Sequence, residues 1–256
     1  MLHTVVNGAP TGRPPLLIAH GLFGSARNWN AISRRLSEVR QVLTVDMRNH
    51  GESDWAAPHD YPAMAADLAE VISAHGGRAD VLGHSMGGKA AMTLALTTPD
   101  LVARLIVADV APVPYTHSQI EPLRAMQHLD LNGLTSRMEA DRRMALAVDD
   151  PAMRAFLLQS LDLRADPPRW RLNLSQIETD MDAILSFPEF TSRFDGPTLF
   201  LRGALSNYIR PEVEPIIRRL FPHAEFQTID GAGHWLHADK PREFEAAVAA
   251  FLEEAE

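Results

Sequence analysis

The sequence contains no cysteine among its 256 residues. That absence excludes a disulfide framework, a thiolate nucleophile and a cysteine-ligated metal, and it fits a reducing compartment. The 11 histidines do not supply a metal site in its place, because those outside the motifs described below are scattered without the spacing of metal ligands. We therefore predict that the protein uses no metal and no other cofactor.

Basic side chains are also scarce. The chain has 24 Lys and Arg against 33 Asp and Glu, which gives a formal net charge of −9. Because phosphate binding needs clustered positive charge, this balance argues against a nucleic-acid partner.

Long hydrophobic runs are missing as well. No stretch reaches the ~18 apolar residues of a membrane span, and residues 1–10 lack a basic segment followed by an apolar one. We therefore expect a cytoplasmic protein without membrane insertion, and we make no prediction of its oligomeric state.

What the sequence does contain is a regular alternation of short apolar runs with helical patterns. Hydrophobic residues make up 46% of the chain, enough for a substantial core. Strands buried on both faces have this composition, and their alternation with helices predicts a largely parallel sheet. We expect an antiparallel edge strand at residues 2–6 and further strands at 16–19, 41–46, 79–82, 105–110, 198–201 and 224–229. We expect helices at 28–37, 61–74, 86–97, 211–220 and 242–252.

The alternation breaks between residues 112 and 194. This stretch has the pattern of several consecutive helices separated by turn signals, with no convincing strand. An insertion of this kind between two strands would lie over the carboxyl edge of the sheet, where ligands bind in open α/β folds. We therefore predict an α/β core of residues 1–111 and 195–256, with an all-helical cap at residues 112–194.

One serine stands where an apolar run changes into a helical pattern. The sequence Gly83-His84-Ser85-Met86-Gly87 follows the strand expected at 79–82 and leads directly into an alanine-rich segment. A turn this sharp brings the backbones of strand and helix together, so side chains at positions 83 and 87 would collide. We predict a nucleophile elbow that presents the hydroxyl of Ser85, with a glycine-rich structural turn as the alternative.

A serine hydroxyl is a weak nucleophile at neutral pH and needs a base within hydrogen-bond distance. His234 follows Gly231-Ala232-Gly233 directly after the last expected strand, so a flexible loop can carry its imidazole to the elbow. His237 is close enough to compete, and a structural loop histidine is the other alternative. We favour His234 because it directly follows the glycines.

The acid that should orient this histidine is less obvious. On a scaffold with such an elbow it usually follows the strand that ends here at Leu201, but residues 202–208 contain no carboxylate. Asp109 ends the preceding strand inside an apolar run, where a carboxylate needs a partner. We predict that Asp109 is the acid. The alternatives are an Asp109 that only caps local amides and a Ser-His dyad in which Asn207 weakly orients His234.

Acyl transfer also needs donors for the developing oxyanion. A His20-Gly21 turn at the end of an early strand lets the amide of Leu22 converge with the amide of Met86, which follows the nucleophile. We assign these two amides to an oxyanion hole. The side chains that we assign to substrate binding are Phe23, Tyr208 and Trp235.

Four motifs carry a resemblance to a known family: His20-Gly21-Leu22-Phe23-Gly24-Ser25, Asp46-Met47-Arg48-Asn49-His50-Gly51, Gly83-His84-Ser85-Met86-Gly87-Gly88-Lys89-Ala90 and Gly233-His234-Trp235-Leu236-His237-Ala238-Asp239. With them, the chain resembles the α/β-hydrolase superfamily, and within it the small esterases and thioesterases of the YbfF type and the related mitochondrial abhydrolases. The resemblance implies hydrolysis of carboxylic esters, and it extends to acyl-CoA thioesters as a second substrate class. It also implies an acid after the strand that precedes the cap, which matches Asp109.

We therefore predict an α/β-hydrolase fold and a serine hydrolase that cleaves a small-molecule ester or thioester through an acyl-enzyme. Two alternatives share the same residues. One is a cofactor-free perhydrolase or haloperoxidase, and the other is a ligand-binding receptor with low turnover.

Overall fold

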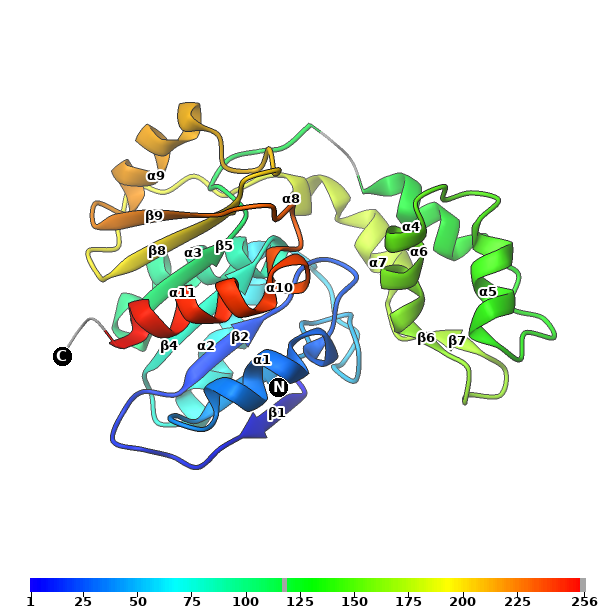
Figure 1. Ribbon diagram of the computed structural model, residues 1–256, viewed down its shortest axis with the longest axis horizontal. Helices are drawn as coiled ribbons and strands as arrows, with labels where there is room; N and C mark the ends of the chain where they lie inside the picture. Colours follow the sequence, from blue (N-terminus) through cyan, green and yellow to red (C-terminus); the bar gives the residue numbers. More distant parts are fainter. Residues whose placement is uncertain (117–118, 254–256) are drawn as a thin grey trace.

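A seven-stranded sheet forms the centre of the computed structural model, which describes residues 1–116 and 119–253 (Figure 1). The strand order is β1-β3-β2-β4-β5-β8-β9. The bounds are β1 (Thr4–Asn7), β2 (Leu16–Ala19), β3 (Val42–Val45), β4 (Ala79–His84), β5 (Val102–Ala108), β8 (Thr198–Gly203) and β9 (Ala224–Ile229). Among the described strands of this sheet, β1 alone runs antiparallel to its neighbour, as the sequence predicts for the edge.

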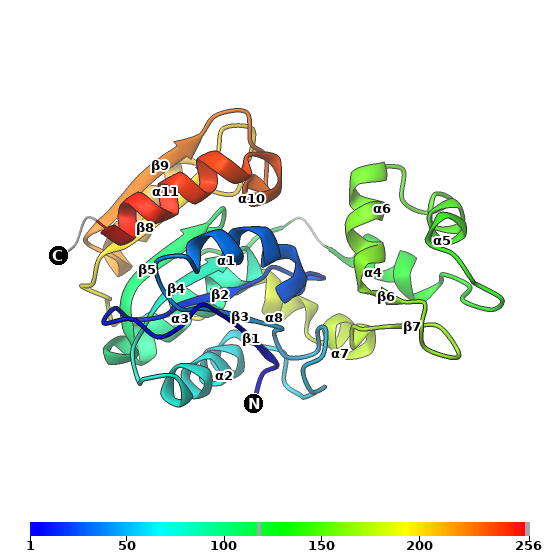
Figure 2. The ribbon, with the colours of Figure 1, turned by 60° about the horizontal axis from the view of Figure 1, so that its bottom comes forward.

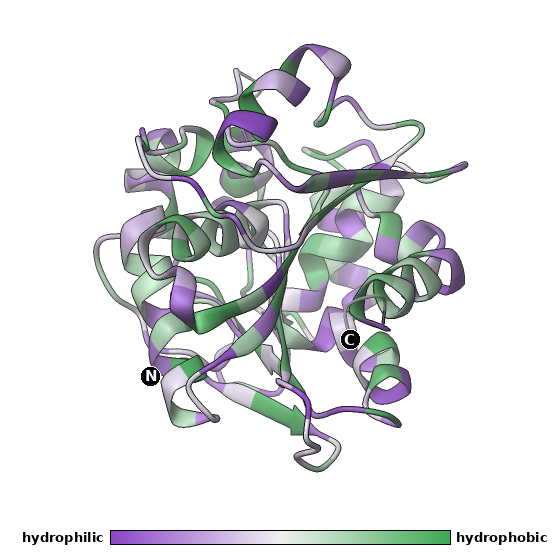
Figure 3. Ribbon diagram, turned by 90° about the vertical axis from the view of Figure 1, so that its left-hand side faces the viewer, coloured by the Kyte–Doolittle hydropathy of each residue, from purple (hydrophilic) through white to green (hydrophobic). Residues whose placement is uncertain are grey.

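Helices cover both faces of the sheet (Figure 2). One face packs against α1 (Asn30–Leu36) and α11 (Pro241–Glu253), and the other against α2 (Tyr61–Ala74), α3 (Met86–Thr97) and α9 (Glu214–Leu220). Figure 3 shows mixed hydrophobic and hydrophilic segments along the outer helices, as amphipathic elements require. Within the described residues, no helix is both long enough and apolar enough to cross a membrane.

The strand before the insertion ends earlier than its apolar pattern predicts. We expect a strand at residues 105–110, but β5 covers Val102–Ala108. Asp109 adopts a φ of +52°, which is incompatible with an extended strand, so the chain turns at this residue. The apolar Val110 and Ala111 are buried beyond the strand rather than within it.

The segment between β5 and β8 forms a lobe beside the sheet (Figures 1 and 2). Its helices are α4 (Ile120–Gln127), α5 (Arg137–Met144), α6 (Pro151–Leu157), α7 (Leu174–Thr179) and α8 (Met181–Leu185). The prediction of an all-helical insertion is wrong in one respect, because β6 (Leu161–Asp162) pairs antiparallel with β7 (Arg169–Trp170). Strands of two residues are too short for an alternating pattern to reveal them. The boundaries at residues 112 and 194 stay a prediction.

Candidate active site

The turn between β4 and α3 holds Ser85 in a strained backbone conformation. Its φ is +52°, a region that non-glycine residues rarely occupy. The neighbouring glycines are required by space, since a Cβ at Gly83 would lie 2.2 Å from the carbonyl oxygen of Gly87. A Cβ at Gly87 would lie 2.4 Å from the carbonyl oxygen of Ala19. Close contact between backbones therefore forces the turn and exposes the serine side chain to the pocket.

Two residues far apart in the sequence meet this serine. Nε2 of His234 lies 3.2 Å from Oγ of Ser85, and Nδ1 of the same ring lies 2.8 Å from Oδ2 of Asp109. Asp109 is completely buried at the end of β5. The structure thus joins the serine, the imidazole and the carboxylate in one hydrogen-bonded chain.

A residue that the sequence reasoning missed completes the surroundings of the carboxylate. The hydroxyl of Ser206, in the loop after β8, donates to Oδ2 of Asp109, and the backbone amide of Gly203 donates to Oδ1 at 3.1 Å. Asn207, considered above as a weak orienter, is exposed, and its side chain forms no hydrogen bond with any described residue. The dyad with Asn207 is therefore wrong. The loop that lacks a carboxylate contributes a hydroxyl donor instead.

The two neighbouring histidines have other partners. The ring of His237 stacks on Trp29 with a centroid separation of 4.3 Å, and burial lowers the pKa of His237 to about 3. His84 is also buried, which lowers its pKa well below the usual value and keeps the ring neutral. Its Nε2 donates to the backbone carbonyl of His234 at 2.9 Å. His84 therefore ties the loop of His234 to the elbow, and His237 does not contact the serine.

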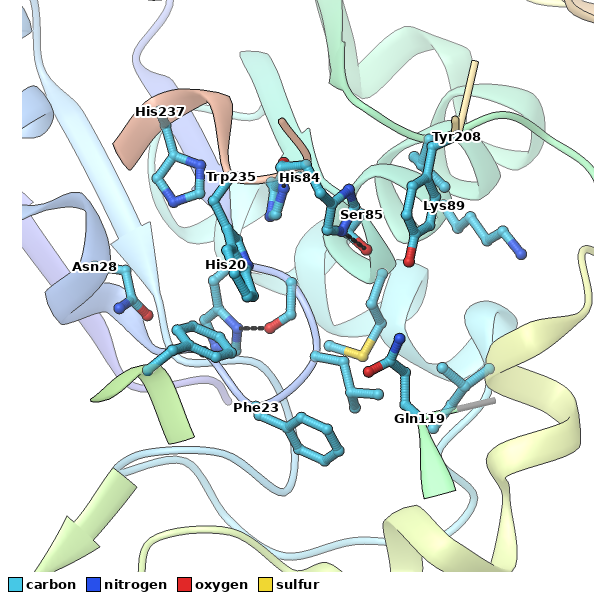
Figure 4. Close-up of a pocket in the computed structure, with 18 of the residues that line it drawn as sticks. His20, Phe23, Asn28, His84, Ser85, Lys89, Gln119, Tyr208, Trp235 and His237 are labelled. Carbon is cyan, nitrogen blue, oxygen red and sulfur yellow. Dashed lines mark hydrogen bonds between the residues drawn. The ribbon is translucent and has the colours of Figure 1, made fainter. Parts of the chain in front are cut away.

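A cavity of about 260 Å³ opens at the serine, and Phe23, Tyr208 and Trp235 all line it. Figure 4 shows Phe23 and Trp235 to one side of Ser85 and Tyr208 to the other. The Tyr208 ring stacks on the imidazole of His234 at 3.9 Å with an interplanar angle of 14°. The aromatic face therefore packs against the imidazole and restricts the orientation of its ring.

The same cavity is lined by Leu22 and Met86. Neither backbone amide donates a hydrogen bond to another atom of the described chain. The loop of Leu22 is held rigidly, because the amide of Phe23 donates to Nε2 of His50 at 3.2 Å and the amide of Met47 donates to Nε2 of His20 at 2.9 Å. Both amides are thus available to an oxygen atom bound beside Ser85.

The described residues contain no group of His, Asp or Glu side chains arranged to hold a metal ion.

Comparison with known proteins gives consistent matches along the chain. A family model described as alpha/beta hydrolase fold matches residues 14–241. The sn-1-specific diacylglycerol lipase ABHD11 of Mus musculus is 42% identical over 248 residues, covering 93% of this chain and 81% of that protein. Esterase YbfF of Escherichia coli is 33% identical over 242 residues, covering 93% and 92%. A solved marine microorganism esterase superposes with a TM-score of 0.92 at 37% identity, covering 98% of both chains.

The close contact of backbones at the turn between β4 and α3 predicts how a substitution there changes stability. Substituting Gly87→Ala should lower the free energy of unfolding by about 3 kcal/mol, because the new methyl group meets backbone carbonyls that cannot move aside. The control is Gly12→Ala, where nothing lies within 4 Å of the added Cβ and the unfolding midpoint in urea should not fall. Equal midpoints for the two variants would contradict the close packing of strand and helix.

Proposed function

The chain belongs to the α/β-hydrolase family and is a carboxylic ester hydrolase, and we propose that it works through an acyl-enzyme formed on Ser85. The observation that carries the proposal is the hydrogen-bonded chain from Ser85 through His234 to the buried Asp109. Each contact is within the distance needed for proton transfer or for orienting the base.

In the first half of the proposed reaction, Oγ of Ser85 attacks the ester carbonyl while Nε2 of His234 accepts the hydroxyl proton. Asp109 accepts a hydrogen bond from Nδ1, which fixes the tautomer and stabilises the imidazolium. The imidazolium then donates its proton to the leaving alkoxide as the C–O bond breaks, which leaves an acyl group on Ser85.

In the second half, water loses a proton to His234 and attacks the acyl carbonyl, and the same proton returns to Ser85 as the acid departs. The amides of Leu22 and Met86 are proposed to hold the oxyanion in both halves, a role supported by their free N–H groups at the cavity. Losing one such donor typically costs about 3 kcal/mol of barrier height.

The proposed substrates are esters whose acyl group fits the cavity of about 260 Å³ at Ser85. Acyl-CoA thioesters pass through the same steps and form the second proposed class. The relatives named as esterase and as diacylglycerol lipase support an ester rather than a peroxide or halide reaction.

Substituting Ser85→Ala tests the nucleophile. Hydrolysis of a p-nitrophenyl ester series from acetyl to palmitoyl, and of the matching CoA thioesters, should fall by about 10⁶-fold because no acyl-enzyme can form. A fluorophosphonate probe should label residue 85 in the folded wild type and leave the variant unlabelled. A wild type that acylates once without steady turnover would instead be a receptor.

Substituting Asp109→Asn tests the acid. We expect turnover to fall by about 10⁴-fold, because an amide no longer holds the imidazole in the productive tautomer. Ser206→Ala should cost about tenfold, since it removes one hydrogen bond to the carboxylate and leaves the carboxylate in place. Near-wild-type rates for Asp109→Asn, measured alongside unchanged thermal unfolding, would remove Asp109 from the proposed mechanism.

A further inference from the structure

Lys89 is an unusual residue in this chain. Only two of the 24 basic side chains are lysines, and Lys89 is 2% exposed on α3, four residues after Ser85. Its side chain lines the same cavity as Ser85 and extends away from it behind Tyr208 (Figure 4). No local pattern in the sequence indicates where its ammonium points.

The ammonium of Lys89 binds the end of a helix from the insertion. Nζ donates to the carbonyl of Leu185 at 3.0 Å and to the carbonyl of Ser186 at 2.5 Å. The hydroxyl of Tyr61, on α2, donates to the carbonyl of Ile184. These carbonyls belong to the last turn of α8 and the residue after it, where a helix leaves acceptors without partners in the helix. A cation at a helix C-terminus is also favoured by the helix dipole.

This helix end forms part of the cavity wall. Ile184 and Leu185 line the cavity together with Tyr61 and Lys89. The chain leaves the core near Tyr115, whose amide donates to the carbonyl of Leu185 at 2.9 Å, so the exit and the return of the insertion meet at one point. The position of this wall relative to Ser85 therefore depends on hydrogen bonds from α2 and α3 of the core.

Among the described residues, the groups around the ammonium are polar and carry no negative charge. Nζ lies 4.7 Å from the ring centroid of Tyr115 and 5.5 Å from that of Tyr61, and burial raises the pKa of both phenols, so they stay neutral. No carboxylate of the described residues forms an ion pair with Lys89, and burial lowers its pKa to about 7. In the described part of the chain, carbonyl oxygens and aromatic faces are the groups that contact the ammonium.

We propose that Lys89 and Tyr61 act as a clamp that determines acyl-chain selectivity, by holding the end of α8 so that Ile184 and Leu185 form a fixed wall of the acyl pocket. The proposal rests on ester hydrolysis at Ser85. Lys89 and Tyr61 are positioning residues in it, because they act through the wall and not on the reacting atoms.

The test compares kcat/KM for acetyl, butyryl, hexanoyl and octanoyl p-nitrophenyl esters in wild type, Tyr61→Phe and Lys89→Met. Releasing the wall should widen the pocket, so the octanoyl-to-acetyl ratio should rise about fivefold, the equivalent of one hydrogen bond. The change should come from KM for the octanoyl ester. Lys240→Met is the matched control. Lys240 is the other lysine of the sequence and does not line the cavity, so its removal should leave the ratio unchanged.

Wild type alone provides a second measurement, which holds even where Lys89→Met fails to fold. The pKa of Lys89 is about 7, so at lower pH the ammonium is charged and its hydrogen bonds to the end of α8 are strongest. The charge is lost as the pH rises through that value. The octanoyl-to-acetyl ratio should therefore rise between about pH 6 and about pH 8.5. Both esters use the same base, so the titration of that base cancels in the ratio. Tyr61→Phe should raise the ratio at every pH.

Three outcomes would overturn the clamp while leaving ester hydrolysis intact. These are a uniform loss on all four esters in folded variants, a ratio unchanged in Tyr61→Phe, and a wild-type ratio independent of pH. Failure of the proposed function would be recognised separately, because no ester would then be turned over by wild type.

Discussion

The close approach of two backbones at the elbow is the constraint on which the site depends. Positions 83 and 87 have no room for a Cβ, and Ser85, which lies between them at the start of α3, is held at a φ of +52°. This strain can persist only because β4 lies between two parallel neighbours and α3 is buried along almost its whole length. The packing of the rigid core thus offsets the backbone strain at Ser85 and holds its side chain toward the pocket.

The carboxylate of Asp109 reaches His234 from the end of β5, although the acid of such a triad usually follows the strand that corresponds to β8. Asp109 leaves β5 with the same positive φ as the serine, and its amide donates to the carbonyl of Leu201 on β8. It therefore projects under the loop after β8, where the acid of related folds usually originates. Ser206 in that loop donates to Asp109 instead of competing with it. A carboxylate at both positions would place two like charges beside one imidazole, which is unfavourable in a buried site.

Local patterns explain what was predictable from sequence. The core strands, the antiparallel edge and the elbow follow from apolar runs and from two glycines, all of which act over a few residues. Asp109 stood out because a carboxylate within an apolar run needs a partner, and its role in the reaction stays a prediction. Ser206, Tyr61 and Lys89 could not be assigned, because their partners lie between 96 and 123 residues away. The β6–β7 pair was not predicted because strands of two residues are too short to show an alternation of apolar and polar residues.

The core and the insertion contribute differently to the proposed site: the core supplies the reacting groups, and the insertion forms part of the pocket wall. Every group proposed to act on the reacting atoms lies outside residues 112–194, so the insertion can change without altering the chemistry. The insertion instead shapes the pocket: Phe156 packs on Trp235 with centroids 5.3 Å apart, Ser160 donates to the carbonyl of Phe23, and the end of α8 is held by Lys89 and Tyr61. The buried amine of Lys89, four residues after Ser85, therefore links α3 to the pocket wall formed by the end of α8. If Ser85 is the nucleophile and this wall meets the acyl chain, as we propose, any shift of α3 moves both together.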